Sequence, residues 1–191
     1  MAKGPLIILS GPSGSGKSTI IAEVLRRSAL PLRVSISATT RAPRSNEVNS
    51  VHYFFWSKEK FVEEKQKGAF LESAEVHGNC YGTLLSEVER HRENGIGVLL
   101  DIDVQGARQV RQRIPETVTV FLKTSSWEAY ERRIRRRGTE DEAAIQRRLG
   151  SARRELACIA EYQYILINDD DNLEAAVNQL LEIVQLSFPK E

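Results

Sequence analysis

The stretch Leu9–Ile20 reads LSGPSGSGKSTI, and it places three glycines and a lysine between two apolar segments. The residues before it, Leu6–Leu9, form an apolar run that is typical of a strand covered on both faces. After the lysine, apolar side chains recur at helical spacing, at Ile20, Ile21, Val24 and Leu25. The stretch therefore connects a predicted buried strand to a predicted amphipathic helix.

Residues Gly11–Ser18 match the pattern GxxxxGK[ST] at every fixed position. Glycines let successive backbone N–H groups point at phosphate oxygens, and the following helix adds its positive end. Lys17 can reach the β and γ phosphates of a nucleotide, and the Ser18 hydroxyl can ligate Mg²⁺. A plain flexible turn is the alternative, but both flanks are those that a phosphate loop requires. We therefore predict a nucleotide site at Gly11, Pro12, Ser13, Gly14, Ser15, Gly16, Lys17, Ser18 and Thr19.

The composition favours one ordinary globular domain of 191 residues, of which 41% are hydrophobic. Because 27 Lys and Arg face 26 Asp and Glu, the net charge gives no reason to expect a nucleic-acid or membrane partner. The apolar run near the N-terminus is too short for a signal peptide or a spanning helix, so we expect a soluble, cytoplasmic protein. Cys80 and Cys158 are expected to be reduced thiols. Monomer and homodimer both stay open.

Short apolar runs alternate with helical patterns along the rest of the chain. Strand-like runs occur at 97–103, 117–122 and 164–168, and helical periodicity occurs at 104–114, 126–138, 142–156 and 172–187. This alternation predicts an α/β fold in which helices cover both faces of a parallel sheet. Two segments break the rhythm. Residues 33–84 are polar and β-rich and are expected to form an inserted substrate-binding lobe, and 126–156 is a second inserted piece. The core is then 4–32, 85–125 and 157–191.

Acidic residues follow the predicted strand at 97–103. Asp101 and Asp103 are expected to share one strand face. Either carboxylate can hold the water shell of Mg²⁺ or position an arginine, and a solvated strand end is the alternative. Asp101 is a candidate to contact the metal through water, and the choice between Asp101 and Asp103 stays open.

Two arginines, Arg41 and Arg44, lie three residues apart in the segment SATTRAPR, where Pro43 forbids a long helix. Two forked guanidinium groups suit a phosphate, and Tyr53 and Tyr81 could donate further hydrogen bonds. Taken alone, an arginine pair on a loop is more often a solvated surface.

The helical patterns at 126–138 and 142–156 are rich in arginine. A helical wheel places Arg133 and Arg137 at the edge of the first apolar face, and Arg148 beside the apolar stripe of the second. A charged residue on an inward edge needs a partner there. A nucleic-acid patch is the alternative, but the net charge is near zero and no aromatic residues are interleaved.

The motifs SGPSGSGKST, SATTRAPR, HYFF, FLESAEVHGNCYGT, LDIDVQGA, RRRGTEDEAAIQRRL and IND resemble those of the guanylate kinase family, in order and spacing, from Ser10 to Asp169. The resemblance implies a three-layer P-loop NTPase fold with a GMP-binding lobe at 33–84 and a helical lid at 126–156. It also implies Mg²⁺-dependent transfer of the γ-phosphoryl group of ATP to GMP, with the use of dGMP left open. This chain departs from the family pattern at Asn46 and Ser50, where the family usually has glycine.

The resemblance also implies roles for individual residues. Guanine presents two adjacent donors, N1–H and N2–H, which one carboxylate accepts together, whereas adenine presents an acceptor at N1. In the family, the residues at Ser37 and Glu72 read the base, and those at Arg41, Arg44, Tyr53 and Tyr81 bind the GMP phosphate. Thr83 and Asp101 line the acceptor site, Asn168 lies near the ATP base, and the lid carries Arg133, Arg137 and Arg148 toward the phosphates.

Two other functions remain in competition. Non-catalytic guanylate-kinase-like modules bind protein partners, but they typically lack a complete phosphate loop, which this chain has. A kinase for another phosphorylated small molecule should lack the pair that reads guanine, yet Ser37 and Glu72 are both present.

Overall fold

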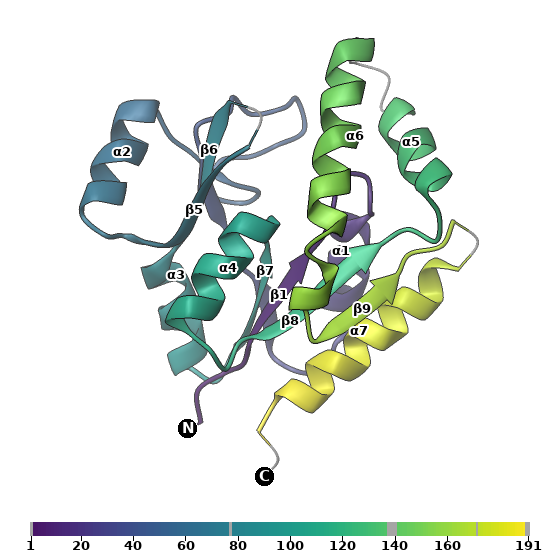
Figure 1. Cartoon of the computed structure of the whole chain (residues 1–191). Coiled ribbons are helices and arrows are strands. Elements are labelled where there is room, and N and C mark those ends of the chain that lie inside the picture. The colour runs from purple at the N-terminus through teal and green to yellow at the C-terminus, as the bar shows by residue number, and fades with distance from the viewer. Residues whose placement is uncertain (1, 77, 137–140, 171, 190–191) are drawn as a thin grey trace.

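The main sheet has five parallel strands in the order β2-β7-β1-β8-β9. It is seen in a computed structural model that describes residues 2–76, 78–136, 141–170 and 172–189. The strand bounds are β1 Leu6–Ser10, β2 Leu32–Val34, β7 Gly97–Asp101, β8 Val118–Lys123 and β9 Tyr164–Ile167. The central strand β1 leads directly into the phosphate loop, and α1 (Lys17–Arg27) follows the loop (Figure 1).

Helices cover both faces of this sheet, as the alternation of patterns predicted. In β1, Ile7 and Leu9 pack under α1 and α7 (Leu173–Ser187). Leu6 and Ile8 face the other way, toward α3 (Leu85–Glu93), α4 (Val104–Arg113) and the end of α6 (Glu142–Leu156). A strand buried on both faces needs apolar residues at every position, which explains the uninterrupted run in the sequence.

A second, mixed sheet has the order β4-β3-β6-β5. Its strands are β3 Ser37–Thr39, β4 Phe54–Phe55, β5 Phe70–Val76 and β6 Asn79–Leu84, and α2 (Lys58–Gln66) covers it. Ala38, Phe61 and Phe70 form a small core of their own, and the Phe61 and Phe70 rings stack with centroids 4.5 Å apart. The second sheet therefore has a small core of its own, and Leu71 of β5 also joins it to one cluster of the main sheet.

The boundary of the predicted lobe differs at its start. We placed residue 33 in the lobe, but Arg33 and Val34 pair with Val98 and Leu99 in the main sheet. The polar sequence was misleading because β2 is an edge strand, so one flank of it faces solvent and tolerates charge. The second sheet begins at Ser37.

The helix pair α5 (Trp127–Arg135) and α6 rises on the same side of the main sheet as the second sheet, and both chain ends lie at the opposite side (Figure 1). The two helices pack through Trp127, Ile134, Ile145 and Leu149. A short 3₁₀ helix, η1 (Ile159–Glu161), leads from α6 to β9. The second sheet and α6 therefore both lie at the end of the main sheet where β1 leads into the phosphate loop (Figure 1).

Ser50 has the left-handed backbone angle φ 64°, and it is the only non-glycine residue with positive φ among those that the structure describes. Its N–H donates to the carbonyl oxygen of Tyr53 at 2.8 Å, which closes a turn at the tip of the lobe. Asn46, the other position where the family has glycine, is not in this conformation. A left-handed residue with a Cβ atom costs about 1–2 kcal/mol.

Replacing Ser50 by glycine should therefore stabilise the protein. Glycine removes the steric cost but adds about 0.5–1 kcal/mol of backbone entropy to the unfolded chain. The expected net gain is about 0.5–1 kcal/mol, or about 1–4 °C in Tm. Thermal unfolding of Ser50→Gly is compared with Ser45→Gly, a matched change at an exposed serine of the same loop without positive φ. Equal Tm values for the two variants would show that the positive φ of Ser50 carries no steric cost.

Candidate active site

The phosphate loop has a strained backbone that only glycine adopts readily. Gly11, Gly14 and Gly16 have φ values of 142°, 90° and 94°. A Cβ atom on Gly11 would lie 2.1 Å from the carbonyl oxygen of Leu122, and one on Gly16 would lie 2.1 Å from the Nδ2 atom of Asn168. The glycines are therefore needed both for the backbone angles and for close packing against the ends of β8 and β9.

Lys17 is the first residue of α1, and its Nζ atom donates to the carbonyl oxygens of Gly11 at 2.6 Å and Pro12 at 3.5 Å. The ammonium group therefore lies across the mouth of the loop. The first turn of α1 contains no acidic side chain, and Gly16 caps it without a side-chain hydrogen bond. The positive end of the helix is thus uncompensated, which favours an anion at this position.

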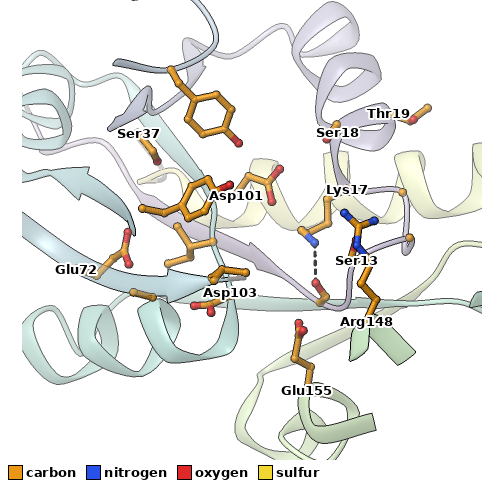
Figure 2. Close-up of a pocket in the computed structure, with 18 of the residues that line it drawn as sticks. Ser13, Lys17, Ser18, Thr19, Ser37, Glu72, Asp101, Asp103, Arg148 and Glu155 are labelled. Atoms are coloured by element: carbon orange, nitrogen blue, oxygen red, sulfur yellow. Dashed lines mark hydrogen bonds between the residues drawn. The ribbon is translucent and has the colours of Figure 1, made fainter. Parts of the chain in front are cut away.

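A cavity of about 300 Å³ extends from this loop to the second sheet. Figure 2 shows Lys17, Ser13 and Arg148 at one side of it, Glu72 and Ser37 at the other, and Asp101 between them. Most of the predicted site residues line it: Gly11, Ser13, Gly14, Gly16, Lys17, Ser18, Thr19, Ser37, Arg44, Tyr53, Glu72, Tyr81, Asp101 and Arg148. Six other predicted residues do not line it: Pro12, Ser15, Arg41, Thr83, Arg133 and Asn168. Arg137 lies outside the described residues.

Glu72 is the buried carboxylate of this cavity, with 4% of its surface exposed. Its Oε1 atom accepts two hydrogen bonds from Thr83, one from the backbone N–H at 2.9 Å and one from Oγ1 at 2.7 Å. Burial raises the pKa of Glu72 to about 7, the Thr83 hydrogen bonds oppose this, and the charge of Asp103 adds to it. Thr83, predicted to line the site, therefore acts by holding this carboxylate.

Tyr53 and Tyr81 meet edge to face between the two ends of the cavity, with ring centroids 6.1 Å apart. Burial, together with the charge of Asp101, raises the pKa of Tyr53 to about 12, so its hydroxyl stays a hydrogen-bond donor. Burial also raises the pKa of Asp101, and the charge of Lys17 opposes that rise. Two donors and an acidic group thus lie where a phosphate could approach Lys17.

Arg41 does not line this cavity and is held by Glu47, a residue that the sequence reasoning missed. Its two terminal nitrogens donate to the two oxygens of Glu47, both at 2.9 Å. Glu47 also accepts the backbone N–H of Arg44 at 2.8 Å, and the Arg41 charge lowers the pKa of Glu47. The guanidinium group of Arg41 lies 5.6 Å from the centre of the Tyr53 ring. The sequence did contain a signal for this contact, because Glu47 lies only three residues after Arg44 and six after Arg41.

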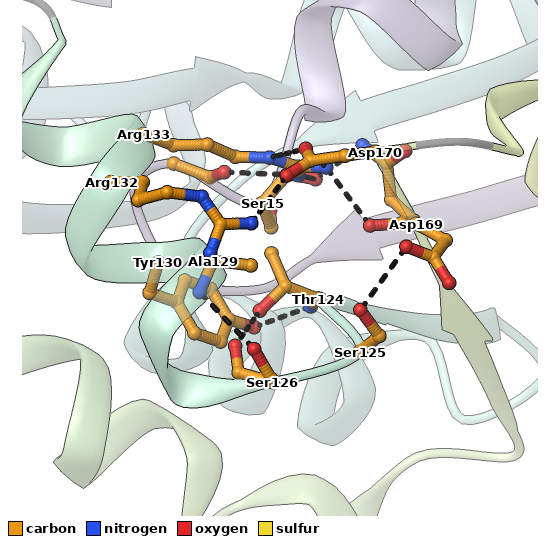
Figure 3. Close-up of polar contacts among 12 residues, drawn as sticks. Ser15, Thr124, Ser125, Ser126, Ala129, Tyr130, Arg132, Arg133, Asp169 and Asp170 are labelled. Atoms are coloured by element: carbon orange, nitrogen blue, oxygen red, sulfur yellow. Dashed lines mark hydrogen bonds and ion pairs between the residues drawn. The ribbon is translucent and has the colours of Figure 1, made fainter.

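Arg133, predicted to be catalytic, contacts the backbone of the loop (Figure 3) and does not line the main cavity. It donates to the carbonyl oxygens of Gly14 at 3.4 Å, Ser15 at 3.2 Å and Asn168 at 3.0 Å. Its Nε atom donates to Asp170 at 2.7 Å. The helical wheel was right that Arg133 faces inward, but its partners are carbonyl groups and a carboxylate.

A second cavity of about 600 Å³ borders the loop, and it is lined by Gly14, Gly16, Thr19, Arg133, Arg136, Asn168, Asp169, Asp170 and Leu173. Asn168 is buried, and its Nδ2 atom donates to the Ser15 carbonyl oxygen at 2.7 Å. Through this hydrogen bond Asn168 holds the phosphate loop, a contact that the sequence alone gave no reason to expect.

Helix α6 contributes Arg148 and Glu155 to the main cavity. Glu155 extends toward Lys17 in Figure 2, and burial raises its pKa while the Lys17 charge opposes the rise. Glu155 lies seven positions after Arg148, two turns along the same face of α6. Sequence reasoning did not find it, because only the placement of the helix shows that this face borders the cavity.

Asp103 does not share a strand face with Asp101, contrary to the prediction. β7 ends at Asp101, and Asp103 is the N-cap of α4, where its Oδ1 atom accepts the backbone N–H of Gly106 at 2.9 Å. The chain turns from strand to helix between the two residues, so the strand alternation stops there. Asp103 still lines the cavity.

A divalent metal can be tested against these donors. In the described parts of the chain, no group of three or more His, Cys, Asp or Glu residues could hold a metal ion by itself. Mg²⁺ usually keeps several waters and binds through one or two protein oxygens together with substrate phosphates. The Ser18 hydroxyl and the Asp101 carboxylate at the cavity fit that mode.

The fold and this site define a P-loop nucleotide-binding protein. A family model described as Guanylate kinase matches residues 3–187. The guanylate kinase of Synechococcus sp. (strain CC9311) is 49% identical over 181 residues, 95% of this chain and 94% of that protein. That of Vibrio cholerae is 47% identical and covers 89% of this chain and 83% of its own length. The chain belongs to the guanylate kinase family.

A solved structure agrees with this assignment. The crystal structure of guanylate kinase from Anaplasma phagocytophilum matches with a TM-score of 0.80 at 27% identity, covering 100% of this chain and 89% of that one. The family and the α/β fold that the motifs implied are thereby confirmed. Over the residues described, no helix combines the length and apolar character needed to cross a bilayer.

Replacing Glu72 by glutamine should stabilise the protein in a pH-dependent way. The raised pKa means that the folded protein binds this proton more tightly than the unfolded chain, so ionising Glu72 costs stability as pH rises from about 4 to about 7. Glutamine keeps the acceptor for Thr83 and removes that cost, by up to about 3 kcal/mol. Chemical unfolding of both proteins at pH 4.5 and pH 8 measures the difference. A stability gain that is the same at both pH values would contradict the shift.

Proposed function

We propose that this chain transfers the γ-phosphoryl group of ATP to GMP, giving ADP and GDP. One observation carries the proposal: a single cavity joins a phosphate loop with its lysine to a buried carboxylate that can accept two adjacent donors. The names of the relatives, guanylate kinases at 47–49% identity, support it.

The base of GMP binds at Glu72. Guanine N1–H and N2–H donate to the carboxylate, and the Ser37 hydroxyl donates to O6. Thr83 engages Oε1 and so presents the carboxylate edge to the base. Adenine lacks the 2-amino group and has an acceptor at N1, so it would leave a buried carboxylate unpaired, an effect of several kcal/mol.

The GMP phosphate binds between the two ends of the cavity, at Arg44, Tyr53 and Tyr81. Arg41 adds positive charge behind Tyr53, in the orientation that Glu47 gives it. Forked guanidinium groups and phenol hydroxyls together match the oxygens of a phosphate. The phosphate then points toward Lys17 and Arg148.

ATP binds with its phosphates on the loop amides of Gly11–Ser18 and with its base in the second cavity, beside Asn168 and Arg133. Ser18, and Asp101 through water, would hold Mg²⁺, which would supply charge neutralisation to the β and γ phosphates. Arg133 holds the carbonyl side of the loop, which keeps the N–H side directed at the phosphates.

A GMP phosphate oxygen attacks the γ-phosphorus in line with the leaving ADP oxygen. The second pKa of a phosphate monoester is about 6, so the nucleophile is already deprotonated at neutral pH and needs no general base. Lys17 and Arg148 neutralise the charge on the transferring group, and closure of α6 excludes water. Arg137 is expected to join them from the lid.

A coupled assay of ADP formation tests the proposal with ATP and each of GMP, AMP, CMP and UMP. Turnover should require GMP, because only guanine satisfies Glu72. Lys17→Ala should abolish turnover while the far-UV circular dichroism spectrum and Tm stay close to those of the wild type. Equal turnover with AMP and GMP would remove the role of Glu72, and no turnover with any acceptor would sink the proposal.

Arg148→Ala should lower kcat about 10²-fold or more, because it removes a cation from the transferring phosphoryl group. The KM for GMP should change little, since Arg148 lies at the phosphate-loop end of the cavity. Arg147→Ala is the matched control, an exposed arginine one residue earlier on the same helix, and should retain activity. Full kcat in Arg148→Ala would show that the lid arginine takes no part in transfer.

A further inference from the structure

Helix α4 lies against the outer edge of β5, the strand that carries Glu72. β5 is the last strand of the second sheet, so its free edge has no strand neighbour. α4 belongs to the main-sheet layer, where Val104, Ala107 and Val110 are buried. The base-reading strand of one sheet therefore rests on a helix of the other.

Two side chains of α4 bind the β5 backbone on either side of Glu72. Gln109 donates from Nε2 to the carbonyl oxygen of Ser73 at 2.9 Å and accepts the Ser73 N–H on Oε1 at 3.1 Å. Arg113 donates to the carbonyl oxygen of Phe70 at 2.5 Å. The Gln109 amide thus takes the place of a neighbouring strand, at a point where the register between β5 and β6 shifts between Phe70 and Glu72.

The third contact is a close approach at Gly106, in the first turn of α4. A Cβ atom on Gly106 would lie 2.4 Å from the Oε2 atom of Glu72 and 2.9 Å from its Cδ atom. Gly106 has an ordinary helical backbone, without positive φ, and its N–H is bound to Asp103. Glycine is therefore required here for space and not for backbone freedom, since alanine is the better helix former.

We propose that Gly106 and Gln109 are positioning residues for guanine recognition: Gly106 sets the depth of the Glu72 carboxylate, and Gln109 fixes the strand that carries it. The proposal rests on the GMP kinase activity proposed above. Residues 106, 109 and 113 lie on one face of α4 at helical spacing, so the three contacts form one docking surface.

The choice of base measures how the Glu72 carboxylate is positioned. Guanine donates through both N1–H and N2–H, whereas hypoxanthine has N1–H but no 2-amino group. Only a carboxylate at the right depth and angle accepts both donors, so the preference for GMP over inosine monophosphate (IMP) measures its position. A general loss of stability would lower the use of both substrates and leave their ratio unchanged.

Gly106→Ala is the first test. The KM for GMP should rise about tenfold or more, the KM for ATP should stay within about twofold, and the ratio of kcat/KM for GMP over IMP should fall at least about fivefold. Gly150→Ala is the matched control, a glycine inside α6 whose added Cβ atom would meet nothing closer than Arg154 at 3.8 Å. It should leave all three quantities unchanged.

Gln109→Ala is the second test, and it keeps the proposal falsifiable if Gly106→Ala does not fold. It should lower the GMP/IMP ratio about threefold or more, whereas Gln112→Ala, an exposed glutamine on the same helix, should not. A wild-type protein that is inactive with GMP would overturn the proposed function and this inference with it. An active wild type whose Gly106 and Gln109 variants keep the full GMP/IMP ratio would overturn this inference alone.

Discussion

The carbonyl oxygen of Ser15 accepts hydrogen bonds from both Asn168 and Arg133, and the rest of the site depends on this pair. The C=O and N–H groups of one trans peptide point in opposite directions, so binding the Ser15 carbonyl oxygen turns the N–H group of Gly16 to the other side of the loop. The two donors come from the end of β9 and from α5, more than a hundred residues further along the chain. The local glycine motif therefore permits the loop conformation, and distant residues select it.

The site contains three partly or fully buried carboxyl groups whose ionisation destabilises the folded protein. Glu72, Asp101 and Glu155 each have a pKa raised by burial, and each faces the same cavity as Lys17. Buried carboxylates of this kind destabilise the ionised protein, but they become favourable when a ligand supplies donors or a cation. Under the proposed function, the two donors of guanine would offset the cost of ionising Glu72 in the free protein.

Local patterns predicted what depends on local chemistry. The strand, glycine-rich loop and helix at the N-terminal end, the parallel sheet and its covering helices follow from short motifs and periodicity, and the structure has them at those positions. Contacts between distant segments could not be predicted in the same way. The direction of Arg133, the pairing of Arg41 with Glu47 and the approach of Gly106 to Glu72 depend on how elements pack. The start of the lobe was misplaced because an edge strand and an inserted strand can both be polar.

The two ends of the cavity are positioned by two adjacent strands of the main sheet, β1 and β7. β1 leads into the phosphate loop, and β7, which pairs with β1 at Leu9 and Asp101, leads into α4. Because α4 binds the edge of β5, the position of Glu72 follows from β7, as that of Lys17 follows from β1. The separation between the two ends therefore depends on the register of two central strands rather than on a flexible connection. A reaction in which two nucleotides meet end to end requires such a fixed separation, because a small misplacement of the reacting groups slows transfer steeply.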